Sequence, residues 1–167
     1  KMGAKIKIKN GYIVASAAKG LKGCFIKFPK ISVGATENIL IASCLAKGKT
    51  RLRNCALEPE VKDLIIFLKK LGCSINSVGK RGIDITGIKK LKSTKHKVIF
   101  DRIEAGTYII ASALTNGRLK IKNIDPKIMP TEIKILNKMG VKIVKKKNYL
   151  ITSCSKKLKC IDVMTKP

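Results

Sequence analysis

Residues 29–36 combine the residue types that hold a phosphate group. They follow an apolar stretch typical of a strand, Cys24–Phe28, and lead into a helical pattern. The amino end of a helix binds anions, because it carries free backbone N–H groups and the positive end of the helix dipole. Lys30 adds a cation, Ser32 adds a hydroxyl donor, and Gly34 lets a ligand approach the backbone. The same residues also fit an ordinary helix start capped by a hydroxyl side chain, since they form no Walker or dinucleotide-binding motif.

The elements around this segment belong to an internal repeat. Ile41-Ala42-Ser43 recurs 69 residues later as Ile110-Ala111-Ser112, and after a one-residue deletion the spacing becomes 68. Each copy is expected to contain a short helix, a strand, a second helix and two or three further strands. In the first copy the second helix has one apolar face, formed by Val61, Leu64, Ile65, Leu68 and Leu71 at helical spacing.

The pattern predicts a mixed α/β (α+β) fold. Helices are predicted at 36–47, 59–71, 103–115 and 128–139. Strands are predicted at 24–28, 50–54, 73–78, 82–86, 97–101, 118–122, 141–145, 148–152 and 160–164. The first three residues, Lys1-Met2-Gly3, match Lys70-Leu71-Gly72 and Lys138-Met139-Gly140. We interpret them as the last turn of a helix whose body is missing, and therefore expect a chain truncated at both ends.

The net charge of +27 allows two interpretations. Clustered cations bind nucleic acids by releasing counterions from phosphate backbones. However, only five of the 37 Lys and Arg residues are Arg, and the lysines alternate with apolar residues, as in Lys5-Ile6-Lys7-Ile8-Lys9. We therefore favour a lysine-rich solvated surface and an anionic substrate, with a basic nucleic-acid-binding module as the alternative. The longest nearly apolar run, Ile39–Ala46, is shorter than the roughly 20 residues of a membrane span, so we expect a cytoplasmic protein.

Cysteine and histidine give little sign of a metal site. The six cysteines form no CxxC pair, and His96, the single histidine, lies in a polar connector where we expect it to be exposed. Cys44, Cys55 and Cys73 lie inside apolar patterns, where a free cysteine packs as a small hydrophobic residue. The sequence therefore predicts packing rather than metal or disulfide chemistry for these cysteines.

Three ordered motifs resemble those of the UDP-N-acetylglucosamine 1-carboxyvinyltransferases. They are Ser32–Ile39 (SVGATENI), Asn54–Val61 (NCALEPEV) and Asp101–Thr107 (DRIEAGT). The similarity extends over essentially the whole chain. It implies the inside-out α/β prism, which is built from six copies of a sheet-plus-two-helix unit, three in each domain. It further implies that residues 1–99 end the first domain and residues 100–167 begin the second.

The resemblance also assigns site residues. Lys30, Ile31, Ser32 and Val33, with Gly34 beside them, would bind the uridine diphosphate part of the sugar nucleotide. Five charged residues would lie toward the interdomain cleft and hinge, although helix capping explains them equally well: Glu58, Glu60, Asp101, Arg102 and Glu104. Leu57 departs from the family pattern, where many relatives carry Arg, and its effect stays open.

The implied reaction transfers enolpyruvate from phosphoenolpyruvate to the 3′-hydroxyl of UDP-N-acetylglucosamine and releases phosphate. This is the first committed step of peptidoglycan synthesis, and it implies no metal or organic cofactor. The family's acid, base and mobile loop would lie outside this chain, so we assign no catalytic residue and expect the remainder of the same polypeptide to supply them. The alternatives are a transferase resembling 5-enolpyruvylshikimate-3-phosphate synthase and a degenerate, inactive paralogue.

Overall fold

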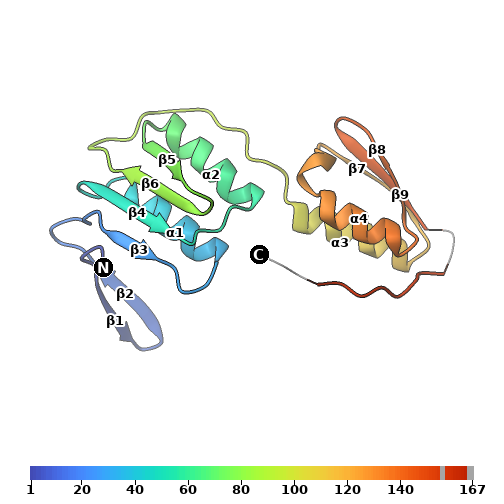
Figure 1. The fold of residues 1–167 in the computed structure, drawn as a ribbon, viewed down its shortest axis with the longest axis horizontal. Coiled ribbons are helices and arrows are strands. Elements are labelled where there is room, and N and C mark those ends of the chain that lie inside the picture. Colours follow the sequence, from blue (N-terminus) through green and yellow to red (C-terminus); the bar gives the residue numbers. More distant parts are fainter. Residues whose placement is uncertain (155–156, 165–167) are drawn as a thin grey trace. The chain divides into compact units, whose positions relative to one another are not determined.

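The computed structural model describes residues 1–154 and 157–164, and it has the mixed α/β architecture predicted from the sequence. The chain divides into two compact units, the first comprising Lys1–Lys97 and the second beginning at Val98 (Figure 1). No helix in the described part of the chain is long and apolar enough to cross a bilayer. The last three residues of the predicted second domain (100–167), at 165–167, lie outside the described residues.

The first unit contains a hairpin followed by a four-stranded sheet with two helices. The hairpin pairs β1 (Lys5–Lys9) with β2 (Tyr12–Ser16). The next elements are β3 (Phe25–Lys27), α1 (Val33–Ser43), β4 (Lys49–Arg53), α2 (Pro59–Lys70), β5 (Ser74–Val78) and β6 (Gly82–Thr86). The strand order is β3-β4-β6-β5, in which only the β3–β4 pair is parallel.

The second unit repeats this plan with fewer strands. It contains α3 (Arg102–Leu114), β7 (Arg118–Lys122), a 3-10 turn (Pro126–Ile128), α4 (Pro130–Lys138), β8 (Lys142–Lys145) and β9 (Tyr149–Ser153). Its sheet order, β7-β9-β8, reproduces β4-β6-β5 of the first unit. Asn54 and Asn123, which the repeat aligns, both have a left-handed backbone, with φ of 60° and 59°. The sequence repeat is therefore a structural repeat.

Three of the predicted elements are absent. Residues 97–101 and 160–164 are irregular, and Lys1–Gly3 form no helical turn. A strand requires a partner for its backbone N–H and C=O groups, which apolar composition alone does not provide. A single helical turn likewise does not form on its own, because helix nucleation costs more conformational entropy than one hydrogen bond recovers. Gly3 nevertheless has a φ of +92°, close to the values of the helix-ending Gly72 and Gly140, +103° and +101°.

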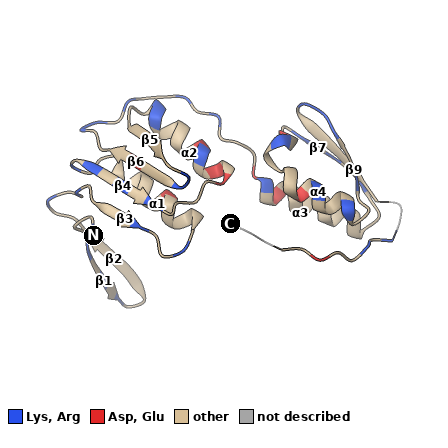
Figure 2. Cartoon of the chain, viewed as in Figure 1, with Lys and Arg blue, Asp and Glu red and all other residues tan. Residues whose placement is uncertain are grey.

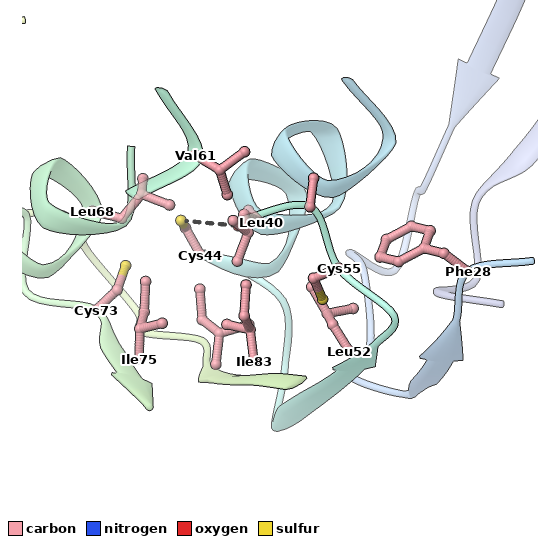
Figure 3. Close-up of a cluster of buried hydrophobic side chains, with 12 residues drawn as sticks. Phe28, Leu40, Cys44, Leu52, Cys55, Val61, Leu68, Cys73, Ile75 and Ile83 are labelled. Carbon is pink, nitrogen blue, oxygen red and sulfur yellow. Dashed lines mark hydrogen bonds between the residues drawn. The ribbon is translucent and has the colours of Figure 1, made fainter. Parts of the chain in front are cut away.

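Each unit has its own aliphatic core. In the first, α1 and α2 cover one face of the sheet, and Leu40, Leu52 and Val61 are completely buried between the helices and the sheet (Figure 3). The three cysteines predicted to pack in the core are buried there. Burial raises the pKa of Cys44 to about 12 and that of Cys55 to about 11, so both thiols stay protonated. In the second unit the hydrophobic residues Ile109, Met129 and Leu150 are completely buried.

Candidate functional site

The loop between β3 and α1 alternates anchoring and exposed side chains. Ile31 and Val33 are half-buried and pack against the core of the first unit. Lys30, Ser32 and Gly34 are exposed. The apolar residues therefore hold the backbone in place while the polar ones face solvent, which is the arrangement required of a ligand-binding loop on a rigid support.

The helix begins at Val33, directly behind this loop, which is three residues earlier than predicted. Ser32 is its N-cap, with an extended backbone, and its Oγ accepts a hydrogen bond of 3.3 Å from the Ala35 N–H. In a helix that begins in this way, the N–H groups of Val33 and Gly34 have no intrahelical acceptor. A Cβ at Gly34 would meet no atom within 4 Å, so the space beside the Gly34 Cα is open.

The electrostatics of this helix start favour an anion. The first turn of α1 contains no acidic residue, and Lys30 precedes it. The equivalent helix of the second unit differs, because its N-cap is a carboxylate. Asp101 accepts hydrogen bonds from the N–H groups of Ile103, at 2.7 Å, and Glu104, at 3.1 Å. The amino end of α3 therefore carries its own anion, whereas that of α1 can accept one.

The loop is bonded to the segment that carries the two predicted cleft glutamates. Asn54 Nδ2 donates to the Phe28 carbonyl at 2.9 Å, and the Ala56 N–H donates to Thr36 Oγ1 at 3.1 Å. These bonds join the start and the end of the loop region to the turn between β4 and α2. The structure thus brings the segment 30–34 close to the chain leading into Glu58.

Glu58 and Glu60 lie at the start of α2 and are half-buried. Glu58 occupies the N-cap position, but its side chain makes no capping hydrogen bond. Its Oε2 is buried and has no hydrogen-bond partner among the residues that the structure describes. A buried carboxylate oxygen of this kind requires a donor, since an unpaired acceptor loses the hydration that it had in water.

The other three predicted cleft residues belong to the second unit. Asp101 caps α3, as described above. Arg102 forms an ion pair with Glu132 of α4, with 2.7 Å between Nη1 and Oε1. Glu104 is exposed and, with Asp101, lines a cavity of about 340 Å³ beside β7. The structure therefore gives Asp101 and Arg102 local structural roles, and their position in a cleft stays a prediction.

Positive charge is distributed widely along the described part of the chain. Figure 2 shows Lys and Arg spread over strands, loops and helices of both units. Asp84 of β6 pairs with two of them on β4, Arg53 at 2.8 Å and Lys49 at 2.9 Å. Within the described ranges, no three His, Cys, Asp or Glu side chains gather as they would around a metal ion.

One expectation about the connector is wrong. His96, predicted to be exposed, has a side chain that is only 8% exposed. Its Nε2 lies 3.1 Å from Asp63 Oδ2, and its ring lies 5.2 Å from that of Phe67, both on α2. The polar sequence around His96 gave no indication of this packing, because both partners lie about 30 residues earlier in the chain. The roles of Thr36 and Asn54 were also missed, although the recurrence of Asn54 as Asn123 was a usable signal.

Comparison with known proteins supports the family that the three motifs indicated. The chain is 58% identical over its whole length to the UDP-N-acetylglucosamine 1-carboxyvinyltransferase of Pelagibacter ubique, covering 40% of that protein. It is 46% identical over 99% of its length to the enzyme of the same name from Endomicrobium trichonymphae, again covering 40%. The chain thus spans about 40% of the length of these curated relatives.

Solved structures show the same fold. The enolpyruvyl transferase NikO from Streptomyces tendae superposes with a TM-score of 0.79 at 24% identity, over 95% of this chain and 41% of that one. An EPSP synthase from Acinetobacter baumannii superposes with a TM-score of 0.65 at 23% identity. The family model of EPSP synthase (3-phosphoshikimate 1-carboxyvinyltransferase) matches residues 1–167, and the chain therefore belongs to this family of enolpyruvyl transferases.

Proposed function

We propose that the chain provides the diphosphate-binding part of a UDP-N-acetylglucosamine 1-carboxyvinyltransferase. This enzyme would transfer enolpyruvate from phosphoenolpyruvate to the sugar 3′-hydroxyl and release phosphate, in the cytoplasm, as the first committed step of peptidoglycan synthesis. The names of the relatives support this choice of substrate. Since the chain spans about 40% of their length, the remainder of the same polypeptide would complete the site, and "complete enzyme" below denotes that polypeptide.

The observation that carries the proposal is the open amino end of α1. Two N–H groups without an intrahelical acceptor, the exposed Lys30 and the Ser32 hydroxyl lie at this helix start. A Cβ at Gly34 would meet no atom within 4 Å, and the first turn carries no acid. The N–H groups of Val33 and Gly34 would donate to oxygens of the diphosphate, which the dipole of α1 also attracts. Lys30 would neutralise part of its charge.

The chemistry of enolpyruvate transfer needs an acid, a base and cations that hold the phosphate. We assign none of these catalytic roles to residues of this chain. What the chain would do is bind and orient the sugar nucleotide, so that its 3′-hydroxyl is presented to groups elsewhere in the complete enzyme. Glu58 and Glu60, and with less direct support Asp101, Arg102 and Glu104, would face the cleft in which this happens.

Calorimetry on the complete enzyme tests the proposal. Titration with UDP-N-acetylglucosamine should give saturable binding, and shikimate 3-phosphate should give none. Lys30→Glu should weaken sugar-nucleotide binding without lowering the thermal midpoint, because Lys30 is exposed. Binding of shikimate 3-phosphate alone would assign the chain to the other substrate branch. Binding of RNA that UDP does not displace would favour the nucleic-acid alternative instead.

A further inference from the structure

We propose that Thr36 and Asn54 are positioning residues of the sugar-nucleotide site. Neither is among the residues that would touch the ligand. Each instead fixes one end of the loop 29–32 to the turn between β4 and α2. This inference rests on the proposed function, since it names the side chains that hold the proposed diphosphate loop in shape.

Asn54 fixes the start of the loop. The backbone pairing of β3 with β4 continues as far as Phe28, whose N–H donates to the Arg53 carbonyl at 3.0 Å. The Phe28 carbonyl then accepts from Asn54 Nδ2 at 2.9 Å, so a side-chain amide provides the next bond. Asn54 can do this because its backbone is left-handed, with a φ of 60°, a conformation that Asn adopts more readily than most residues.

Thr36 fixes the end of the loop. Its side chain is completely buried, and its Oγ1 donates to the Ser32 carbonyl at 2.7 Å. The same oxygen accepts from the Ala56 N–H at 3.1 Å. One hydroxyl group therefore links the N-cap residue of α1 to the backbone of Ala56, which lies 20 residues after Thr36 in the chain. A shift of this link would move Ser32 and the donors that follow it.

The second unit shows that the fold does not need this hydroxyl. At the repeat spacing of 69, the position of Thr36 is occupied by Ala105, which is also buried, at 4% exposure. Helix α3 nevertheless begins normally, capped by Asp101. The unit that has a threonine is the one whose helix start is open to an anion. The threonine hydroxyl is therefore found in the unit that has the proposed site, and helix formation in the second unit does not require it.

The two hydrogen bonds made by Thr36 and Asn54 also position the start of α2. Ala56 is separated from Glu58 by a single residue, so the bond to Thr36 positions the glutamate as well as the loop. The buried Oε2 of Glu58, which has no partner among the described residues, is thus positioned by the same hydrogen bonds as the proposed diphosphate donors. A ligand that contacts both Glu58 and the diphosphate donors would therefore find these two sets of groups at a fixed distance from each other.

Steady-state kinetics of the complete enzyme with three variants tests the inference. Thr36→Val keeps the shape of the side chain and removes its hydrogen bonds, whereas Thr36→Ser keeps the hydroxyl. Asn54→Gly permits the left-handed backbone and removes the side chain with its amide. We expect Thr36→Val and Asn54→Gly to raise the KM for the sugar nucleotide roughly three- to tenfold with kcat within twofold, and Thr36→Ser to restore the KM.

Ser112→Ala provides the matched control. Ser112 is buried, and its Oγ lies 3.1 Å from Thr152 Oγ1 in the second unit, so the variant also removes a buried hydroxyl link. It should lower the thermal midpoint as Thr36→Val does, with an unchanged KM. An equal rise in KM for Ser112→Ala would overturn the inference, because loss of stability would then explain both results.

The outcomes separate this inference from the proposed function. If the unmodified enzyme binds UDP-N-acetylglucosamine and both Thr36→Val and Asn54→Gly bind it equally well, the positioning roles are refuted while the function stands. If the unmodified enzyme does not bind it, the proposed function fails and the positioning roles fail with it. If Thr36→Val does not fold, Asn54→Gly, which permits the left-handed backbone, decides the matter.

Discussion

Replacing Ser32 by Asp would keep the cap of α1 and place a carboxylate where we propose that a diphosphate binds. The substitution copies the second unit, in which Asp101 caps α3 through two backbone N–H groups. Asp caps helices about as well as Ser, and a negative charge at the amino end of a helix adds about 0.3–1 kcal/mol of stability. The thermal midpoint should therefore stay unchanged or rise slightly.

The effect on binding follows from the distance between the charges. A capping carboxylate and a phosphate bound to the next N–H groups would lie about 4 Å apart. Two like charges at that distance repel by about 1 kcal/mol in water and about 4 kcal/mol at the effective dielectric constant of a protein surface. Because Ser32 is exposed, the lower half of this range applies. We expect about a tenfold loss of affinity and at most a hundredfold loss.

Calorimetric titration of the complete enzyme with UDP measures this loss. Ser77→Asp is the matched control, since it adds the same charge at an exposed position on β5, at the opposite edge of the sheet from β3. Three strand spacings, about 14 Å, exceed the Debye length of about 8 Å at physiological salt. This control should bind UDP normally. An unchanged affinity in a well-folded Ser32→Asp enzyme would refute the placement of the diphosphate at α1.

Other perturbations test the scaffold that supports the site. Asp84→Asn should lower the stability at pH 7 by about 1–2 kcal/mol, because the hydrogen bond from Arg53 holds the pKa of this carboxyl below its ordinary value. That stability is present above the unfolded-state pKa and is lost as pH falls through the folded-state pKa, so urea titrations of the two proteins should converge in acid. His96→Ala should speed hydrogen exchange in residues 92–97, because His96 attaches this segment to Asp63 and Phe67 of α2. Exchange as slow as in the unmodified protein would contradict this. Iodoacetamide at pH 8 should label the exposed Cys160 but not Cys44, whose pKa is raised to about 12, until the chain unfolds.

The helices and most of the strands could be predicted because their information is local. The apolar face of α2 repeats at helical spacing, and Val61 and Leu68 on that face are buried as expected. The internal repeat added a second, independent copy of the same information. Residues 97–101 show the limit of this reasoning. Their apolar run resembles a strand, yet Val98 is 72% exposed and the segment remains irregular, because no local pattern provides a partner strand.

The candidate site likewise has some features that the local sequence predicts and others that depend on tertiary packing. The motif beginning at Ser32 was sufficient to predict a helix start near this residue, and helix geometry dictates which N–H groups stay free there. That these groups bind phosphate remains a proposal. The bonds that hold this start join residues 20 and 26 positions apart, Thr36 to Ala56 and Asn54 to Phe28. Such bonds depend on how β3, β4 and α1 pack, and packing is a property of the folded chain. The same holds for the cap of α3. Only the structure shows that the Asp101 carboxylate caps α3, whereas the uncharged Ser32 caps α1 and leaves its amino end without an anion.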